Sequence, residues 1–151
     1  MELLDWVLFV HIVAGALWIG GVMWQEAHVA AHRREGEEAY VLAFLRAQAT
    51  NGKVYPVATI LVIGTALWMV FGRDYLSFGT LWIDIATVLF LLSFATGIGY
   101  YSRGSKKADE AIRQGGYTPE IGASIRTMHM VGRIETIVLL VLVWLMVFQP
   151  G

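Results

Sequence analysis

Three of the four histidines in this chain share one face of a single predicted helix, and this face is where we expect its chemistry to lie. The helix covers the stretch from Trp6 to Glu35, read at alternating spacings of three and four residues. Its first part is long and apolar enough to cross a bilayer, where a polar side chain must face protein or water rather than lipid. The residues on this face include His11, Ala14, Trp18, Gly21, Gln25, His28 and His32.

His11 is the candidate ligand for a haem iron or another metal ion, because neutral imidazole is the commonest protein ligand for both. Asp84, in a later apolar segment, is expected at a similar depth, so the two side chains are predicted to form a buried pair. Asp84 would then orient the imidazole, as a carboxylate behind a ligating histidine often does. The alternative is a structural histidine, hydrogen-bonded to Asp84 or to a backbone carbonyl.

The residues that follow His11 suit a flat cofactor. Trp18 supplies an aromatic wall, and the helix surface is thin at Ala14, Gly15 and Gly21. The alternative interpretation is that these small residues let a neighbouring helix pack closely.

A second candidate site lies at the other end of the same helix. His28 and His32 have the i, i+4 spacing that lets two imidazoles bind one ion, and His129 is a candidate third ligand. Glu26 or Glu35 would complete a site for copper or another divalent ion. The alternative is an ordinary solvated helix end at the membrane surface.

Arg133 and Glu135 open the last apolar segment and, being two residues apart, cannot pair on one helix face. The guanidinium of Arg133 suits a haem propionate or a quinone oxygen, because its planar fork matches carboxylates. The alternative is that Arg133 reaches the lipid phosphates while Glu135 pairs with a histidine.

The composition is that of an integral membrane protein. Of the 151 residues, 57% are hydrophobic and 15% are charged, and a soluble domain of this size cannot bury so much apolar surface. Cysteine is absent, which excludes disulfides, thiolate metal sites and a cysteine nucleophile. The net charge of −1 gives no electrostatic reason to expect nucleic acid as a partner.

Four segments approach the length of about 20 residues that a spanning helix needs. We therefore predict an all-α fold, an antiparallel bundle of four transmembrane helices in which residues 1–151 form one domain. Basic residues concentrate between the first and second segments and between the third and fourth, so both termini are expected outside. The segments are 3–24, 54–71, 81–101 and 131–148.

Glycine and proline mark the expected ends of these helices. The first helix is predicted to continue past the membrane and break near Gly36, and the third to continue to Gly115. The last is predicted to begin at Thr118 and Pro119, before its apolar part. Pro56 is expected in the first turn of the second span, where its missing N–H is tolerated.

Two stretches resemble a known family. The run from His11 to Gly21, HIVAGALWIGG, followed by His32, resembles the first helix of the bacterial membrane-bound protoporphyrinogen oxidases of the HemJ type. The last span, from Arg133 and Glu135 onward, is similar to the last helix of that family. The first helix resembles, more distantly, those of copper-resistance D-type membrane proteins and of other small four-helix relatives.

This resemblance implies a b-type haem in a four-helix bundle, with His11 at the position of the first haem histidine and His32 at that of a later one. The third helix departs from the family, since Asp84 stands where a lysine is usual and no histidine follows before Tyr101. The resemblance therefore implies haem binding more directly than porphyrinogen oxidation.

The function that we expect is that of a haem b redox protein in the bacterial cytoplasmic membrane. As an oxidoreductase it would accept electrons from a porphyrinogen or quinol-like substrate and pass them to a redox partner or quinone. The alternatives are a metal-handling protein that uses the histidine cluster and a membrane scaffold without a cofactor. A chain with so few spans is also a candidate for homo-oligomerisation.

Overall fold

The computed structural model of this chain describes residues 2–72 and 78–150, and every regular element in these two ranges is helical. The elements are α1 (Leu3–His32), η1 (Arg33–Glu35, a 3₁₀ turn), α2 (Glu37–Gly72), α3 (Leu81–Ala95), η2 (Thr96–Tyr101, a π-helix), α4 (Ser102–Gly115) and α5 (Pro119–Phe148).

Four long rods result, because α3, η2 and α4 follow one another without a break. The rods cover Leu3–Glu35, Glu37–Gly72, Leu81–Gly115 and Pro119–Phe148, and each is long and apolar enough to cross a membrane. The all-α fold and the four transmembrane helices predicted from the sequence are thereby confirmed.

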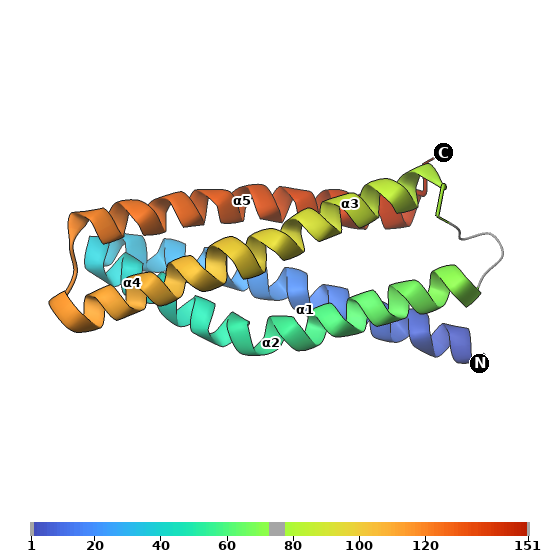
Figure 1. Ribbon diagram of the computed structural model, residues 1–151, viewed down its shortest axis with the longest axis horizontal. Coiled ribbons are helices and arrows are strands. Elements are labelled where there is room, and N and C mark those ends of the chain that lie inside the picture. Colours follow the sequence, from blue (N-terminus) through green and yellow to red (C-terminus); the bar gives the residue numbers. More distant parts are fainter. Residues whose placement is uncertain (1, 73–77, 151) are drawn as a thin grey trace.

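The rods lie side by side as an antiparallel bundle, and both chain ends are at the same end of it (Figure 1). We call this the terminal end. We call the opposite end, where the chain turns at 33–36 and 116–118, the basic end, since it holds Arg33, Arg34, Lys106, Lys107, Arg113 and Arg126. That the basic end faces the cytoplasm stays a prediction from its charge.

The breaks at the basic end occur where glycine and proline predict them. Gly36 and Gly116 adopt φ angles of +118° and +80°, a region that a side chain with a Cβ rarely enters. Thr118 caps α5, its hydroxyl oxygen accepting a hydrogen bond from the N–H of Ile121, and Pro119 occupies the first helical position.

The placement of Pro56 differs from the prediction. Because α2 already begins at Glu37, Pro56 lies in the interior of the helix and not in its first turn. A proline there leaves the carbonyl of Gly52, four residues earlier, without its helical donor. Figure 1 shows α2 bending near its middle, where this hydrogen bond is missing.

The bundle packs as two layers, α1 along α2 and α3 along α5, and two hydrophobic clusters hold the layers together. In the basic half the buried residues are Val29, Tyr40, Val41, Phe44, Leu45, Ala108, Ile125 and Met128. In the terminal half they are Ala86, Leu139, Leu142 and Leu145, with Trp18 and Phe90 packed against them.

The outer faces of the rods are apolar, as expected of a surface in contact with lipid. Large exposed aromatic side chains gather near the terminal end, where they suit the interface between lipid and water. They are Trp6, Phe9, Trp68, Phe71, Phe78, Trp144 and Phe148.

The orientation is testable with single cysteines, since the natural chain has none. Glu2→Cys is at the terminal end and Lys107→Cys at the basic end, and both positions are exposed. We expect a membrane-impermeant maleimide to label only Glu2→Cys in spheroplasts of a bacterial host, and Lys107→Cys only after permeabilisation. The reverse pattern would show that the bundle is inverted.

Candidate functional site

The described residues form a cleft of about 970 Å³. Its walls are α2 on one side and the rod of α3, η2 and α4 on the other, and α1 and α5 contribute its floor. This volume is at the upper end of the range of small-molecule sites. The cleft runs along the helix axes, from side chains at membrane depth to charged side chains in the basic half.

The part of the cleft at membrane depth is apolar and aromatic. The Trp18 ring lies 6.1 Å from that of Tyr55 and 5.5 Å from that of Phe90, measured between centroids. Flat aromatic walls of this kind favour ring-shaped ligands. The side chains that line this part include Trp18, Ile60, Ile63, Phe94, Ile98 and Leu139.

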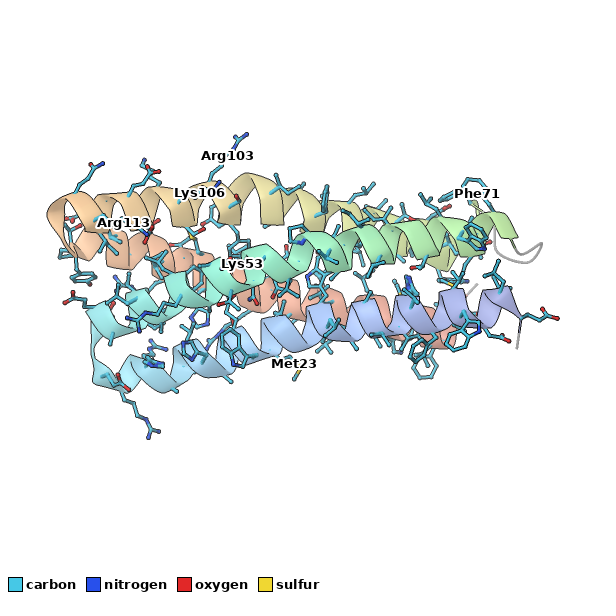
Figure 2. All side chains as sticks on the ribbon, turned by 90° about the horizontal axis from the view of Figure 1, so that it is seen from below. Met23, Lys53, Phe71, Arg103, Lys106 and Arg113 are labelled. Carbon is cyan, nitrogen blue, oxygen red and sulfur yellow. The ribbon has the colours of Figure 1, made fainter. Side chains whose placement is uncertain are left out.

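The other part of the cleft has a basic rim, which we define as Arg46, Lys53, Lys106 and Arg113. Arg113 pairs with Asp109, at 2.9 Å between Nε and Oδ2, and both are exposed. The other three are cations, and the cleft is also lined by the carboxylates of Glu26 and Glu135. Figure 2 shows Arg103 projecting outward from α4, so this arginine does not belong to the rim.

Both walls of the cleft contain an irregular backbone. Gly52 and Pro56, between which a helical hydrogen bond is missing, line it from α2, and Gly97, Ile98 and Tyr101 of the π-helix line it from the other side. A π-helical turn inside an α-helix is frequent at functional sites. The irregularities thus meet across the same cleft.

A chain of hydrogen bonds fixes the carboxylate of Glu26 on the floor of the cleft. His129 Nε2 lies 2.9 Å from Glu26 Oε2, and His129 Nδ1 lies 2.8 Å from the hydroxyl of Tyr40. Arg133 Nε also donates to Glu26 Oε2, at 3.4 Å. Since an ionised carboxylate only accepts, His129 donates from Nε2 to Glu26, and its Nδ1 shares a hydrogen bond with the Tyr40 hydroxyl.

Gly132 leaves room for this group. A Cβ added there would lie 3.5 Å from Glu26 Oε1 and 3.1 Å from the Tyr101 hydroxyl, which donates to the Met128 carbonyl. Nearby, Asn51 Nδ2 donates to Gln25 Oε1 at 2.8 Å, and both side chains are buried. Polar contacts therefore join α1, α2 and α5 beside the cleft.

His11 is buried, but its partner is Thr65 and not Asp84. Its Nδ1 lies 2.9 Å from the Thr65 Oγ1. The single hydroxyl hydrogen of Thr65 is directed at the backbone carbonyls one turn earlier, so Thr65 accepts from His11 Nδ1–H. This leaves the lone pair on Nε2, the tautomer that a metal-ligating histidine needs.

Asp84 lies at the start of α3, where it is exposed. Its Oδ1 accepts a hydrogen bond from the N–H of Gly79 at 3.1 Å, and its charge suits the N-terminal end of the helix. The predicted His11–Asp84 pair is therefore wrong, because similar depth does not make two side chains face each other.

The small residues of α1 serve close packing where the structure fills their space. A Cβ on Gly21 would lie 3.0 Å from the Tyr55 ring, so the expected space for a flat cofactor is taken by Tyr55. Ala14 is buried, while a Cβ added at Gly15 would have no atom within 4 Å. Of the five residues expected around the cofactor on α1, Trp18 lines the cleft and His11, Ala14, Gly15 and Gly21 do not.

The histidines of the basic half do not come together as predicted. The His28 and His32 rings lie 4.5 Å apart, but His32 Nδ1 bonds to the His28 carbonyl, and Trp24 stacks on His28. His129 has both ring nitrogens occupied by Glu26 and Tyr40. Within residues 2–72 and 78–150, no three His, Asp or Glu side chains form a group that could hold a metal ion.

Sequence reasoning did not identify five residues that shape these sites. Tyr40 and Asn51 lie in polar stretches outside the predicted spans, whereas Tyr55, Thr65 and Ser93 are lone hydroxyls within them. A lone hydroxyl or amide in a spanning helix usually has a partner or faces a cavity, and this signal would have pointed to the latter three.

Comparisons with known proteins place the chain by family. A family model described as "Predicted integral membrane protein (DUF2269)" matches residues 5–150, almost the whole chain. No curated protein and no solved structure matches it. The comparisons therefore agree with the membrane-spanning fold and assign no reaction.

Proposed function

We propose, on the premise that this chain belongs to the DUF2269 family of predicted integral membrane proteins, that it binds a carboxylate-bearing ring compound in its cleft. The observation that carries the proposal is that one cleft joins an aromatic, apolar part to a basic rim. An amphipathic molecule matches both parts at once. Its apolar body would lie at membrane depth and its anionic group at the rim.

The apolar part argues for a ring. Ring faces stack on aromatic side chains in preferred geometries, and Trp18, Tyr55 and Phe94 line the cleft. Burial of apolar area contributes about 25 cal/mol per Å², so a large flat body gains much of its affinity there.

The rim argues for a carboxylate or a similar anion. Lys53 from α2 and Lys106 from α4 approach the cleft from opposite walls, and Arg46 adds a third cation. All three cations are exposed, so solvent screens their attraction for an anion and each is expected to contribute modestly. Three carboxylates line the same cleft, those of Glu26, which is held by His129 and Arg133, of Asp109, which is paired with Arg113, and of Glu135.

The proposal is compatible with one of the substrate classes that the HemJ-type resemblance implies. A porphyrinogen carries carboxylates on an apolar macrocycle and matches both parts of the cleft, whereas a quinol-like molecule has no carboxylate for the rim. Oxidation of such a ligand is a further proposal, which depends on a redox cofactor.

Haem b ligated by His11 is a second candidate function, favoured by one observation. The Thr65 contact leaves Nε2 of His11 free to act as an iron ligand, with Thr65 holding the ring. Haem would supply electron transfer. The fit is partial, because His11 does not line the cleft and precedes Trp18, which does, by seven residues or about 10 Å of helix.

The rim is tested with 2-naphthoate and its neutral isostere 2-naphthamide, using protein in phosphatidylcholine nanodiscs and equilibrium dialysis. We expect Lys53→Gln combined with Lys106→Gln to weaken naphthoate binding about tenfold, since each exposed ion pair contributes up to about 1 kcal/mol. Binding of the amide should change little. Arg103→Gln is the matched control on α4 and should leave both affinities unchanged. Equal affinities of the double variant and the wild type for naphthoate would refute the proposal.

The haem candidate is tested by the visible spectrum of purified protein after incubation with hemin. If His11 ligates the iron, His11→Ala abolishes the Soret band and its shift on reduction, and Thr65→Val weakens haem binding by releasing the ring. His28→Ala, another imidazole of α1, should leave the spectrum unchanged. A His11→Ala spectrum identical to that of the wild type would exclude this ligand.

A further inference from the structure

Two hydroxyl groups on the cleft are buried without a hydrogen bond. Among the described residues, the buried side-chain nitrogen and oxygen atoms that have no partner are the Tyr55 hydroxyl and Ser93 Oγ. Both residues line the cleft, Tyr55 from α2 and Ser93 from α3. Most buried polar groups in native proteins are hydrogen-bonded, because an unpaired one costs free energy. Two exceptions at one cleft call for a ligand that pairs with them.

Two other hydroxyls of the same cleft, those of Tyr101 and Ser105, do have hydrogen-bond partners. Tyr101 lines the cleft and donates to the Met128 carbonyl at 2.9 Å. Ser105 lines it as well and donates to the Tyr101 carbonyl at 2.6 Å. The cleft is thus lined by one tyrosine and one serine whose hydroxyls are unpaired, and by one tyrosine and one serine whose hydroxyls are paired.

The two unpaired hydroxyls lie within the aromatic, apolar part of the cleft, since Ser93 is next to Phe94 and the Tyr55 ring lies 6.1 Å from that of Trp18. Ser93 precedes Lys106 by thirteen residues on the same rod, which is about 20 Å. Tyr55 follows the rim residue Lys53 by two residues on α2, about 3 Å along the axis. A ring molecule whose carboxylate lies at Lys53 would therefore extend past Tyr55 toward Ser93 on the opposite wall.

We propose that Tyr55 and Ser93 form a hydrogen-bonding subsite for an oxygen atom on the ligand ring. The ligand class is then an oxygenated ring carboxylate, with a hydroxyl or carbonyl group at the edge opposite the carboxylate. A hydroxyl side chain donates to a ring carbonyl and also accepts from a ring hydroxyl, so both forms satisfy it. This inference rests on the proposed function, since it takes the rim as the carboxylate site.

The subsite makes a prediction for the protein without ligand. Tyr55→Phe and Ser93→Ala remove groups that have no partner, so we expect the melting temperature to stay the same or rise. Tyr101→Phe and Ser105→Ala remove groups that donate hydrogen bonds, and we expect each to lower it. If Tyr55→Phe and Ser93→Ala lower the melting temperature as much as the two controls, the hydroxyls are already paired and the inference is wrong.

Binding tests the subsite directly with two probes that differ by one hydroxyl, 6-hydroxy-2-naphthoate and 2-naphthoate. We expect the wild type to bind the hydroxylated probe about fivefold more tightly, the effect of one net hydrogen bond. Tyr55→Phe and Ser93→Ala should each reduce this preference, and the double variant should abolish it. Tyr101→Phe and Ser105→Ala should retain it.

The outcomes separate the subsite from the proposed function. If 2-naphthoate binds and depends on Lys53 and Lys106, but the hydroxyl brings no preference or the preference survives in the Tyr55→Phe, Ser93→Ala double variant, the subsite is refuted and the cleft proposal stands. If neither probe binds, or if the Lys53→Gln, Lys106→Gln double variant binds 2-naphthoate as tightly as the wild type, the proposed function is refuted and the subsite with it.

Discussion

The bond between His129 and the carboxylate of Glu26 is the contact on which the arrangement of the basic half depends. It joins α5 to α1, and the Tyr40 hydroxyl on the other ring nitrogen adds α2. The His129 side chain is 8% exposed and that of Glu26 21%, so the pair is largely removed from water. Loss of either partner would leave a buried polar group unpaired, which is costly.

The cleft follows from how the layers are joined. α1 packs along α2 and α3 along α5, while the polar contacts and the basic-half cluster hold the two layers at one end. The wall helices α2 and α4 therefore meet less closely than the helices within each layer. Proline at position 56 and the π-helical turn at Thr96–Tyr101 give both walls an irregular backbone at the same place. An amphipathic cleft is the result, with charge at the basic end and aromatic side chains at membrane depth.

The sequence predicted the rods and their ends, because these depend on local chemistry. Apolar length determined the four spans, Gly36 ended the first rod, and Thr118 with Pro119 began the last. Contacts between rods were predicted less well. Residue counting placed His11 and Asp84 at similar depth, but depth does not specify which way a helix face turns, and Thr65 occupies the position expected for Asp84.

The same limit explains the histidine cluster of the basic half. His28, His32 and His129 were correctly expected near one end, yet His129 turns toward Glu26 and Tyr40 on the inside of the bundle.

The sequence also does not distinguish a small residue that lets another side chain pack closely from one that leaves open space. Gly21 accommodates the Tyr55 ring, whereas Gly15 has no close neighbour.

The most direct test of the account is to fill the cleft. Gly97 lines it and has no atom within 4 Å of an added Cβ, whereas Gly99 lies in the same π-helical turn, is equally open and does not line it. The measurement is the affinity of Gly97→Phe and Gly99→Phe for 2-naphthoate in phosphatidylcholine nanodiscs. The account predicts that Gly97→Phe loses binding while Gly99→Phe keeps the wild-type affinity. Wild-type affinity in Gly97→Phe would contradict it, because the ligand would then bind outside the cleft.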